Sequence, residues 1–326
     1  MMKRCLLILS LLALMPLLSS CVQTASPLAA PATMVPGVDA ELPEAEPPAE
    51  MNRQETAALY FRYMDEPYLA AEYRVVTPSA NKPYEQALLS ALVSGPSGLD
   101  LTSLFPAGVQ VLSASRQGRT LFVTLSKEIM NPYPDEVIAT YSTRDAILRR
   151  RLCMQSIAAT VTENCDVDQV QILVQQDAAM TGSLRLEKRY FLTGESGLTE
   201  PFGRDESLLL TPHTTMNVIL QLCRQQDWQR LYHYLIRVDQ TLNASRPSYE
   251  SFVAAMDALP ALTEYACSTG SVSQYGQTAA FVCDASLRLE DGRQVDKTGS
   301  ILRLTRENGL WRITLDSLTG WLEVTP

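Results

Sequence analysis

Apolar positions between residues 57 and 198 alternate in some stretches and recur every three to four residues in others. Alternating runs rich in Tyr, Phe and Val predict strands, and the longer spacing predicts helices. The turn Asp65-Glu66-Pro67 separates the first two strand runs, so we expect a hairpin there. Strands are expected at 57–64, 69–76, 109–115, 120–125 and 170–174, and helices at 83–93 and 144–162. The expected order is β-β-α-β-β-α-β, followed by a hairpin-like stretch at 184–192.

From about residue 205 onward, helical spacing comes first and strands follow. Thr211 and Pro212 form an N-cap and first-turn pair for a helix that ends at Gln225. Asn308-Gly309 is a strong hairpin signal. Further helices are expected at 228–236 and 248–259, and strands at 263–273, 278–290, 297–306 and 311–315. This order predicts an α+β domain in which the helices cover one face of a curved antiparallel sheet.

The first twenty residues have the pattern of a signal peptide. Lys3 and Arg4 precede an apolar run, residues 6–18, that is too short to span a bilayer. The next string, Leu18-Ser19-Ser20-Cys21, resembles a lipobox, where bacterial lipoprotein processing attaches a diacylglycerol to the Cys and cleaves before it. The alternative is an ordinary secretory signal with a chance Cys. We expect removal of residues 1–20 and lipidation of Cys21, which would anchor the protein on the extracytoplasmic face of the cell membrane.

Residues 21–56 have a composition that cannot bury a core. From Val22 to residue 56 there are six prolines, six acidic residues and no aromatic residue. This is typical of a disordered, partly polyproline-like linker, with a reach of roughly 30 Å on average and about 120 Å when fully extended. We divide the remaining chain into domains at 57–198 and 199–326, which are expected to work at some distance from the bilayer.

The charge of the exported chain restricts its partners. Removing residues 1–20 takes away two basic residues and no acidic one, so the formal net charge changes from −9 to −11. An acidic protein is a poor candidate for binding nucleic acid or an anionic lipid surface. We therefore expect the attached lipid, and not charge, to hold the protein at the membrane.

Five cysteines remain beyond Cys21. Cys267 and Cys283 lie symmetrically about Tyr275 on two consecutive expected strands, so they could face each other across a hairpin. Export permits oxidation, and the sequence leaves a disulfide and two separate core thiols equally open. The other three are expected as buried thiols: Cys153, Cys165 and Cys223.

The sequence contains no recognisable catalytic, cofactor-binding or metal-binding motif. His213 and His233 fall in expected helical segments without a partner at metal-ligand spacing. The nearest string to a nucleophile elbow, Gly194-Glu195-Ser196-Gly197, lacks the required spacing. We therefore expect a protein that is not an enzyme and carries no cofactor.

Residues 57–198 resemble the GerMN domain, the sporulation and spore-germination domain found in exported lipoproteins. The resemblance rests on six phrases in the expected order: Tyr60-Phe61; Glu85-Gln86-Ala87-Leu88-Leu89 running into Ser94-Gly95-Pro96; Leu104-Phe105-Pro106-Ala107-Gly108-Val109; Phe122-Val123-Thr124-Leu125-Ser126; Gln155-Ser156-Ile157-Ala158-Ala159-Thr160-Val161; and Val170-Gln171-Ile172-Leu173-Val174. The resemblance implies an assembly or interaction role in a cell-envelope complex, without catalytic residues.

The C-terminal phrase from Arg306 to Ile313 resembles the last hairpin of the NTF2-like (cystatin-like) superfamily. Members of that superfamily often enclose a pocket, so this resemblance leaves open a small apolar ligand in the second domain. Two hypotheses follow. The first is a membrane-anchored, non-catalytic scaffold or assembly lipoprotein in sporulation or germination. The second is a small-ligand binding or sensing lipoprotein coupled to a membrane partner, which a cavity in the second domain would favour and a filled core would disfavour.

Overall fold

The computed structural model describes residues 55–78, 81–137, 143–176, 182–239 and 244–324. Residues Met51–Pro326 group into one compact unit. The predicted signal peptide, the predicted lipidation site Cys21 and residues 22–54 of the predicted linker lie outside the described residues. Glu55 and Thr56, which the sequence analysis placed in the linker, begin the first strand. None of the helices in the described ranges is long and apolar enough to cross a membrane.

A three-stranded antiparallel sheet opens the described chain, with the order β2-β1-β3. The strands are β1 (Glu55–Tyr63), β2 (Leu69–Val76) and β3 (Leu101–Thr102). The turn with Asp65 and Pro67 joins the first two strands, as the sequence predicts, and Arg62 lies opposite Leu69 in the register. β2 is an edge strand of this sheet.

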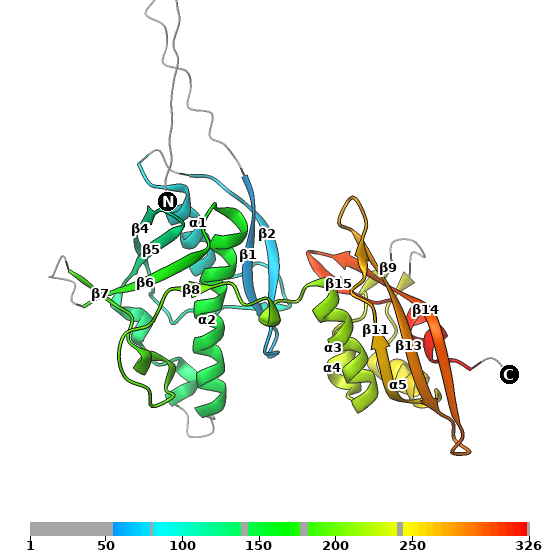
Figure 1. Cartoon of the computed structure of the whole chain (residues 1–326). Coiled ribbons are helices and arrows are strands. Elements are labelled where there is room, and N and C mark those ends of the chain that lie inside the picture. The colour runs from blue at the N-terminus through cyan, green and yellow to red at the C-terminus, as the bar shows by residue number, and fades with distance from the viewer. Residues whose placement is uncertain (1–54, 79–80, 138–142, 177–181, 240–243, 325–326) are drawn as a thin grey trace, which may run out of the picture. The chain divides into compact units, whose positions relative to one another are not determined.

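The second sheet has the order β4-β5-β6-β7, with β8 paired to β6. Its strands are β4 (Val111–Gln117), β5 (Thr120–Leu125), β6 (Gln169–Gln175), β7 (Ser183–Arg185) and β8 (Phe202–Gly203). β5 and β6 are parallel, so the chain must cross over between them. The crossover is the longest described helix, α2 (Thr143–Asn164), which runs beside the sheet in Figure 1.

Helix α2 also completes the backbone hydrogen bonding of β1. Ser156 donates from Oγ to the carbonyl oxygen of Tyr60 (2.6 Å), and the Tyr60 N–H donates to Thr160 Oγ1 (3.0 Å). One helical turn further on, Asn164 accepts from the N–H of Ala58 (2.9 Å) and donates to its carbonyl (2.8 Å). These polar side chains, spaced four residues apart, replace a neighbouring strand along this part of β1, because buried backbone groups need partners.

Helix α1 (Tyr84–Val93) packs against α2, β1 and β4. Short 3-10 helices complete this half of the chain: η1 (Lys127–Met130), η2 (Pro134–Val137), η3 (Lys188–Phe191) and η4 (Glu206–Leu208).

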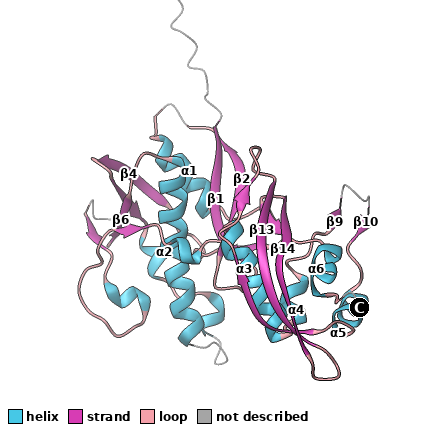
Figure 2. Ribbon diagram, turned by 45° about the vertical axis from the view of Figure 1, so that its right-hand side comes forward, coloured by secondary structure: helices cyan, strands magenta, loops and turns pink. Residues whose placement is uncertain are grey.

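The C-terminal half consists of helices followed by an antiparallel sheet. Thr211 caps α3 (Pro212–Gln225) by accepting from the Thr214 N–H, and α4 (Trp228–Tyr232) and α5 (Tyr249–Asp257) follow. The sheet has the order β11-β13-β14-β15, with β12 paired to β13. The remaining elements are β9 (Val238–Asp239), β10 (Ala244–Ser245), β11 (Ala261–Cys267), β12 (Ser271–Val272), β13 (Thr278–Arg288), β14 (Gln294–Glu307), β15 (Leu310–Arg312) and α6 (Leu315–Leu322). Figure 2 shows the long β13–β14 hairpin, which dominates this sheet.

The inner face of this sheet is filled by apolar side chains. Phe281 and Leu287 of β13, Leu302 and Leu304 of β14 and Phe252 of α5 each expose at most 1% of their surface. The predicted α+β class and the helices on one face of a curved sheet are confirmed. The NTF2-like resemblance stays a prediction.

Several predicted elements differ from the structure. The helix expected at 228–236 ends at Tyr232, because the chain from Tyr234 to Ile236 bonds to Ile313 instead. The strand expected at 263–273 is split into β11 and β12. The strand expected at 311–315 ends at Arg312, and α6, which the sequence analysis missed, begins at Leu315.

The hairpin-like stretch expected at 184–192 is also only partly a strand. It forms β7 and then the 3-10 helix η3, because Glu187 and Lys188 bond to residues 197 and 198 rather than to a returning strand.

Candidate interaction surface

Cys267 and Cys283 lie directly opposite each other on β11 and β13 and form a disulfide, with their Cα atoms 4.2 Å apart. Cys283 is buried and Cys267 partly exposed. The bond joins neighbouring strands of the C-terminal sheet, so its role in the fold is structural.

The other cysteines differ in burial. Cys153 and Cys223 are buried. Burial raises the pKa of the Cys153 thiol to about 12, so this thiol stays protonated at neutral pH. Cys165 is partly exposed, which corrects the expectation of a buried thiol, because it lies just past the end of α2.

The two histidines lie in different surroundings. His213 is exposed in α3 beside Asn217. His233 follows α4, and burial lowers its pKa below the ordinary value. In the described ranges, no group of three His, Cys, Asp or Glu side chains could hold a metal ion.

The structure brings together aromatic and arginine side chains where β2 meets the β14–β15 hairpin. The Arg306 guanidinium lies over the ring of Tyr73, 4.5 Å from its centroid, and 5.4 Å from that of Trp311. Arg306 also donates to the Tyr73 hydroxyl and to the Gly309 carbonyl (3.4 Å). We call Tyr73, Arg306 and Trp311 the arginine stack.

The Asn308-Gly309 turn allows the close approach that builds this stack. Gly309 has φ +85°, and a Cβ atom there would lie 2.8 Å from the Ala71 carbonyl oxygen of β2. A side chain at this position would therefore push the hairpin away from β2. The sequence identified the turn correctly but gave no indication that it packs against a strand more than 200 residues earlier.

Two grooves flank the arginine stack and share Tyr73 and Gly309. The larger, of about 640 Å³, runs between β2, the loop 97–101 and the turn at 308–310. The smaller, of about 260 Å³, is lined by the stack itself and by the following residues: Tyr60, Ala71, Leu209 to Pro212, Val272, Gly276 and Gly309. Both grooves border Tyr73 and Gly309, and we refer to the two together as the depression.

Large apolar side chains surround this depression and are open to solvent. Leu99 exposes 92% of its surface at the rim of the larger groove, and Tyr73 and Val75 of β2 expose 46% and 54%. Val272 and Tyr275 are exposed beside the smaller groove. Clustered exposed apolar groups often mark an interaction site, and Tyr, Trp and Arg are the residues that most often dominate binding at such sites.

A network of ion pairs lies next to the larger groove. Asp100 pairs with Arg237 and with the buried Arg312 (2.7 Å), and Arg312 also pairs with Glu307 (2.9 Å). Nearby, Glu66 accepts two hydrogen bonds from Arg230. These pairs therefore link the turn before β2 and the loop before β3 to residues of the C-terminal half.

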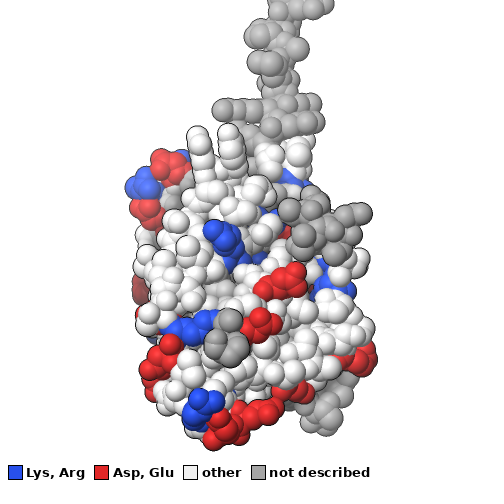
Figure 3. Space-filling view, turned by 90° about the vertical axis from the view of Figure 1, so that its right-hand side faces the viewer, with Lys and Arg blue, Asp and Glu red and all other residues white. Residues whose placement is uncertain are grey.

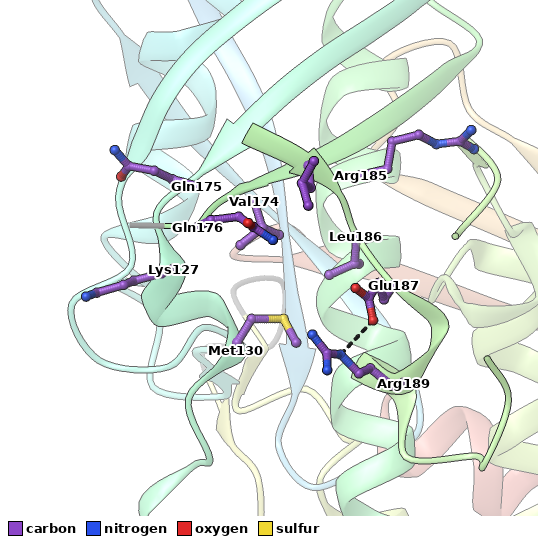
Figure 4. A pocket seen from close by; sticks show the side chains of 10 residues that line it. Lys127, Met130, Val174, Gln175, Gln176, Arg185, Leu186, Glu187 and Arg189 are labelled. Atoms are coloured by element: carbon purple, nitrogen blue, oxygen red, sulfur yellow. Dashed lines mark ion pairs between the residues drawn. The ribbon is translucent and has the colours of Figure 1, made fainter. Parts of the chain in front are cut away.

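Two further grooves lie on the N-terminal half, on either side of η3. Figure 4 shows the first, of about 440 Å³, in which Met130, Val174 and Leu186 surround a hollow and Arg189 pairs with Glu187 (2.7 Å). The second, of about 420 Å³, includes Phe191 and Phe202. Neither contains a cluster of side chains with an evident catalytic arrangement.

The face in Figure 3 carries interspersed charges of both signs, with acidic side chains gathered along its lower margin. Such a surface favours recognition by local contacts over general electrostatic attraction.

In the comparison with known proteins, one family model matches part of the chain. The family model Germane, described as sporulation and spore germination, matches residues 58–178. No curated protein matches the chain.

Three of the solved structures with some likeness to this chain come from Clostridium perfringens and Bacillus subtilis. A presumed lipoprotein from Clostridium perfringens is 25% identical over 47% of this chain and 89% of that one, with a TM-score of 0.26. The tandem GerMN domains of the sporulation protein GerM from Bacillus subtilis are 18% identical over 40% of this chain and 45% of theirs. The first GerM domain alone is 18% identical over the same 40% and 94% of its own length, and both TM-scores are 0.28. Because all three TM-scores are low, these likenesses add no evidence about function.

Proposed function

Residues 58–178 form a domain of the sporulation and spore germination type, and from this premise we propose that the protein is a membrane-anchored, non-catalytic lipoprotein that acts as a scaffold or assembly factor of an envelope complex in sporulation or germination. The family match is the observation that carries the proposal.

The anchor is proposed from the N-terminal sequence. A basic start, a short apolar run and the string ending in Cys21 together fit lipoprotein processing. The attached acyl chains would contribute roughly 0.8 kcal/mol per buried methylene to membrane binding, so several chains give firm anchoring.

The scaffold role is supported by the distribution of surface features. The depression around the arginine stack offers exposed aromatic and apolar side chains, which suit contact with a protein. The filled inner face of the C-terminal sheet disfavours the alternative in which this half encloses a small apolar ligand.

The proposal is tested by crosslinking and affinity purification from the native cell at several growth stages, comparing the wild type with Cys21→Ala. We expect the wild type to recover proteins of a sporulation or germination complex and the variant to lose them. Recovery of the protein alone at every stage, with a copurifying small molecule, would overturn the scaffold role and favour ligand binding.

A further inference from the structure

Arg306 differs from most arginines of this protein in its electrostatic environment. At least thirteen arginines of the described chain form ion pairs with Asp or Glu: Arg62, Arg74, Arg116, Arg119, Arg150, Arg151, Arg185, Arg189, Arg204, Arg230, Arg237, Arg293 and Arg312. Within the described ranges, Arg306 has no such partner, and its side chain donates hydrogen bonds to the Tyr73 hydroxyl and the Gly309 carbonyl and lies against two aromatic rings.

The position of this cation is held by the fold. Stacking on Tyr73 and Trp311 orients the guanidinium plane, and the hydrogen bonds fix two of its three nitrogens. In the described chain the third nitrogen, Nη1, makes no hydrogen bond, and the Arg306 residue is partly exposed to solvent. An oriented guanidinium with a free N–H edge is well suited to a carboxylate, which accepts charge-assisted hydrogen bonds.

A carboxylate would fill only part of the two grooves, which have volumes of about 640 and 260 Å³. The groove beside Arg306 shares Tyr73 and Gly309 with the larger groove. In the described chain, the backbone hydrogen bonds on the outer side of β2 end at Leu69, whose carbonyl accepts from the Leu210 N–H (2.8 Å). The main chain at Tyr73 and Val75 therefore presents an open strand edge, which an extended peptide can pair with.

We propose that this depression binds an extended segment of a partner protein that carries one acidic residue, with this Asp or Glu on Arg306 and neighbouring apolar side chains beside Tyr73 and Leu99. This inference deepens the proposed scaffold role and rests on it for the biological setting. In the larger groove, Arg74 pairs with Glu72 and Arg237 pairs with Asp100. Of the charged residues that line the two grooves, Arg306 is therefore the one that selects for an acidic residue of the partner.

The test uses the exported chain, residues 21–326 with Cys21→Ser, and two pools of fluorescent nonapeptides. Both pools have Leu, Val, Ile, Pro or Ser at the flanking positions, and the central residue is Glu in one and Gln in the other. We expect about tenfold tighter binding of the Glu pool, reflecting one charge-assisted bond at a partly exposed site. The preference should shrink as salt is raised.

Arg306→Gln is expected to abolish the preference for Glu, and Arg306→Lys to keep part of it, because Lys retains the charge but not the planar fork. Arg303→Gln is the matched control, since Arg303 is an exposed arginine on the same strand. It should leave the preference unchanged, and the thermal midpoint of each variant establishes that it is folded.

Equal binding of the Glu and Gln pools by the wild-type chain would overturn the inference whatever the variants do, and so would a preference that survives in Arg306→Gln. These results are independent of the cellular test. If the peptide assay showed no preference for Glu but affinity purification still recovered an envelope complex, only the inference about Arg306 would be wrong. If the peptides showed the preference but no complex was recovered, only the proposed scaffold role would be wrong.

Discussion

Gly270 occupies a position where both its backbone conformation and the close packing of a neighbouring side chain require glycine. Its φ is +76°, and a Cβ atom would lie 2.4 Å from the Phe281 ring, which is buried in the C-terminal core. The chain turns there between β11 and β12, which explains why the predicted single strand is divided.

Gly270→Ala is therefore expected to destabilise the protein by about 1–3 kcal/mol, because overpacking and a strained φ add together. The measurement is the midpoint of urea unfolding. Gly320→Ala is the matched control: Gly320 lies in α6 with open space around it, so alanine should stabilise by about 0.5–1 kcal/mol. An unchanged midpoint for Gly270→Ala would contradict the packing around Phe281.

Glu72 holds the loop beside the larger groove. Burial acts to raise its pKa, but hydrogen bonds from Arg74 and from the backbone N–H groups of Gly98 and Ser97 outweigh burial and keep the pKa below its ordinary value of 4.5. Since the folded state binds this proton less readily than the unfolded state, the stability from Glu72 is present above about pH 4.5 and is lost as pH falls below it.

We expect Glu72→Gln to lower the thermal midpoint at pH 7. The midpoint of this variant should then fall less between pH 7 and pH 3 than that of the wild type. Glu264→Gln, at an exposed position on β11, should change neither quantity. If the wild type and Glu72→Gln lost equal stability on acidification, the loop would not depend on this carboxylate.

At the scale of elements, helix α2 stabilises β1 through buried polar side chains. Thr160 is fully buried and accepts from the Tyr60 N–H at 3.0 Å. Thr160→Val keeps the shape but leaves this N–H without a partner, so we expect a loss of about 1–3 kcal/mol. Urea unfolding measures it.

Thr162→Val serves as the comparison, because Thr162 is partly exposed and its hydroxyl bonds only within its own helix, to the Ala158 carbonyl (2.8 Å). Its effect should stay below about 0.5 kcal/mol. Equal effects of the two substitutions would argue against a strand-like role of α2.

The disulfide between β11 and β13 closes a short loop, with a sequence separation of 16 residues. Chain-entropy reasoning gives about 3 kcal/mol for a loop of roughly this length. We expect Cys267→Ser with Cys283→Ser to lower the free energy of unfolding by up to that amount. Reductant should lower the free energy of unfolding of the wild type to the value of the double variant and leave the double variant unchanged. If reductant did not change the unfolding of the wild type at any urea concentration, the disulfide would not contribute to stability.

At the scale of the whole described unit, Asp100 connects the two halves of the chain. It pairs with Arg237 and with Arg312, whose side chain exposes only 3% of its surface. Asp100→Asn would leave a buried guanidinium without its carboxylate on one side, a change that costs about 3 kcal/mol in comparable buried pairs.

The expected result is a lower thermal midpoint, with residues of both halves becoming less protected from hydrogen exchange. Asp291→Asn is the control, because Asp291 and Arg293 form an exposed pair at 2.6 Å and such pairs contribute less than about 1 kcal/mol. Reduced protection confined to one half of the chain would show that Asp100 does not couple them.

The sequence by itself determined most elements of this protein and their order. Alternation and helical spacing are local properties, so β2, β5 and the end of α3 appear where the pattern predicts them. The phrases of the N-terminal half likewise indicated the family whose model matches residues 58–178. The sequence could also suggest that Cys267 faces Cys283, because the two residues flank one predicted hairpin.

Only the tertiary structure decided what these elements bring together. Ser156, Thr160 and Asn164 look like ordinary polar positions of a helix until β1 lies beside them. The arginine stack brings Tyr73 together with Arg306 and Trp311. The ion pair between Asp100 and Arg312 also joins residues far apart in the sequence. Periodicity carries no information about such contacts, because they depend on how separate elements pack and not on the spacing of residues within any one of them.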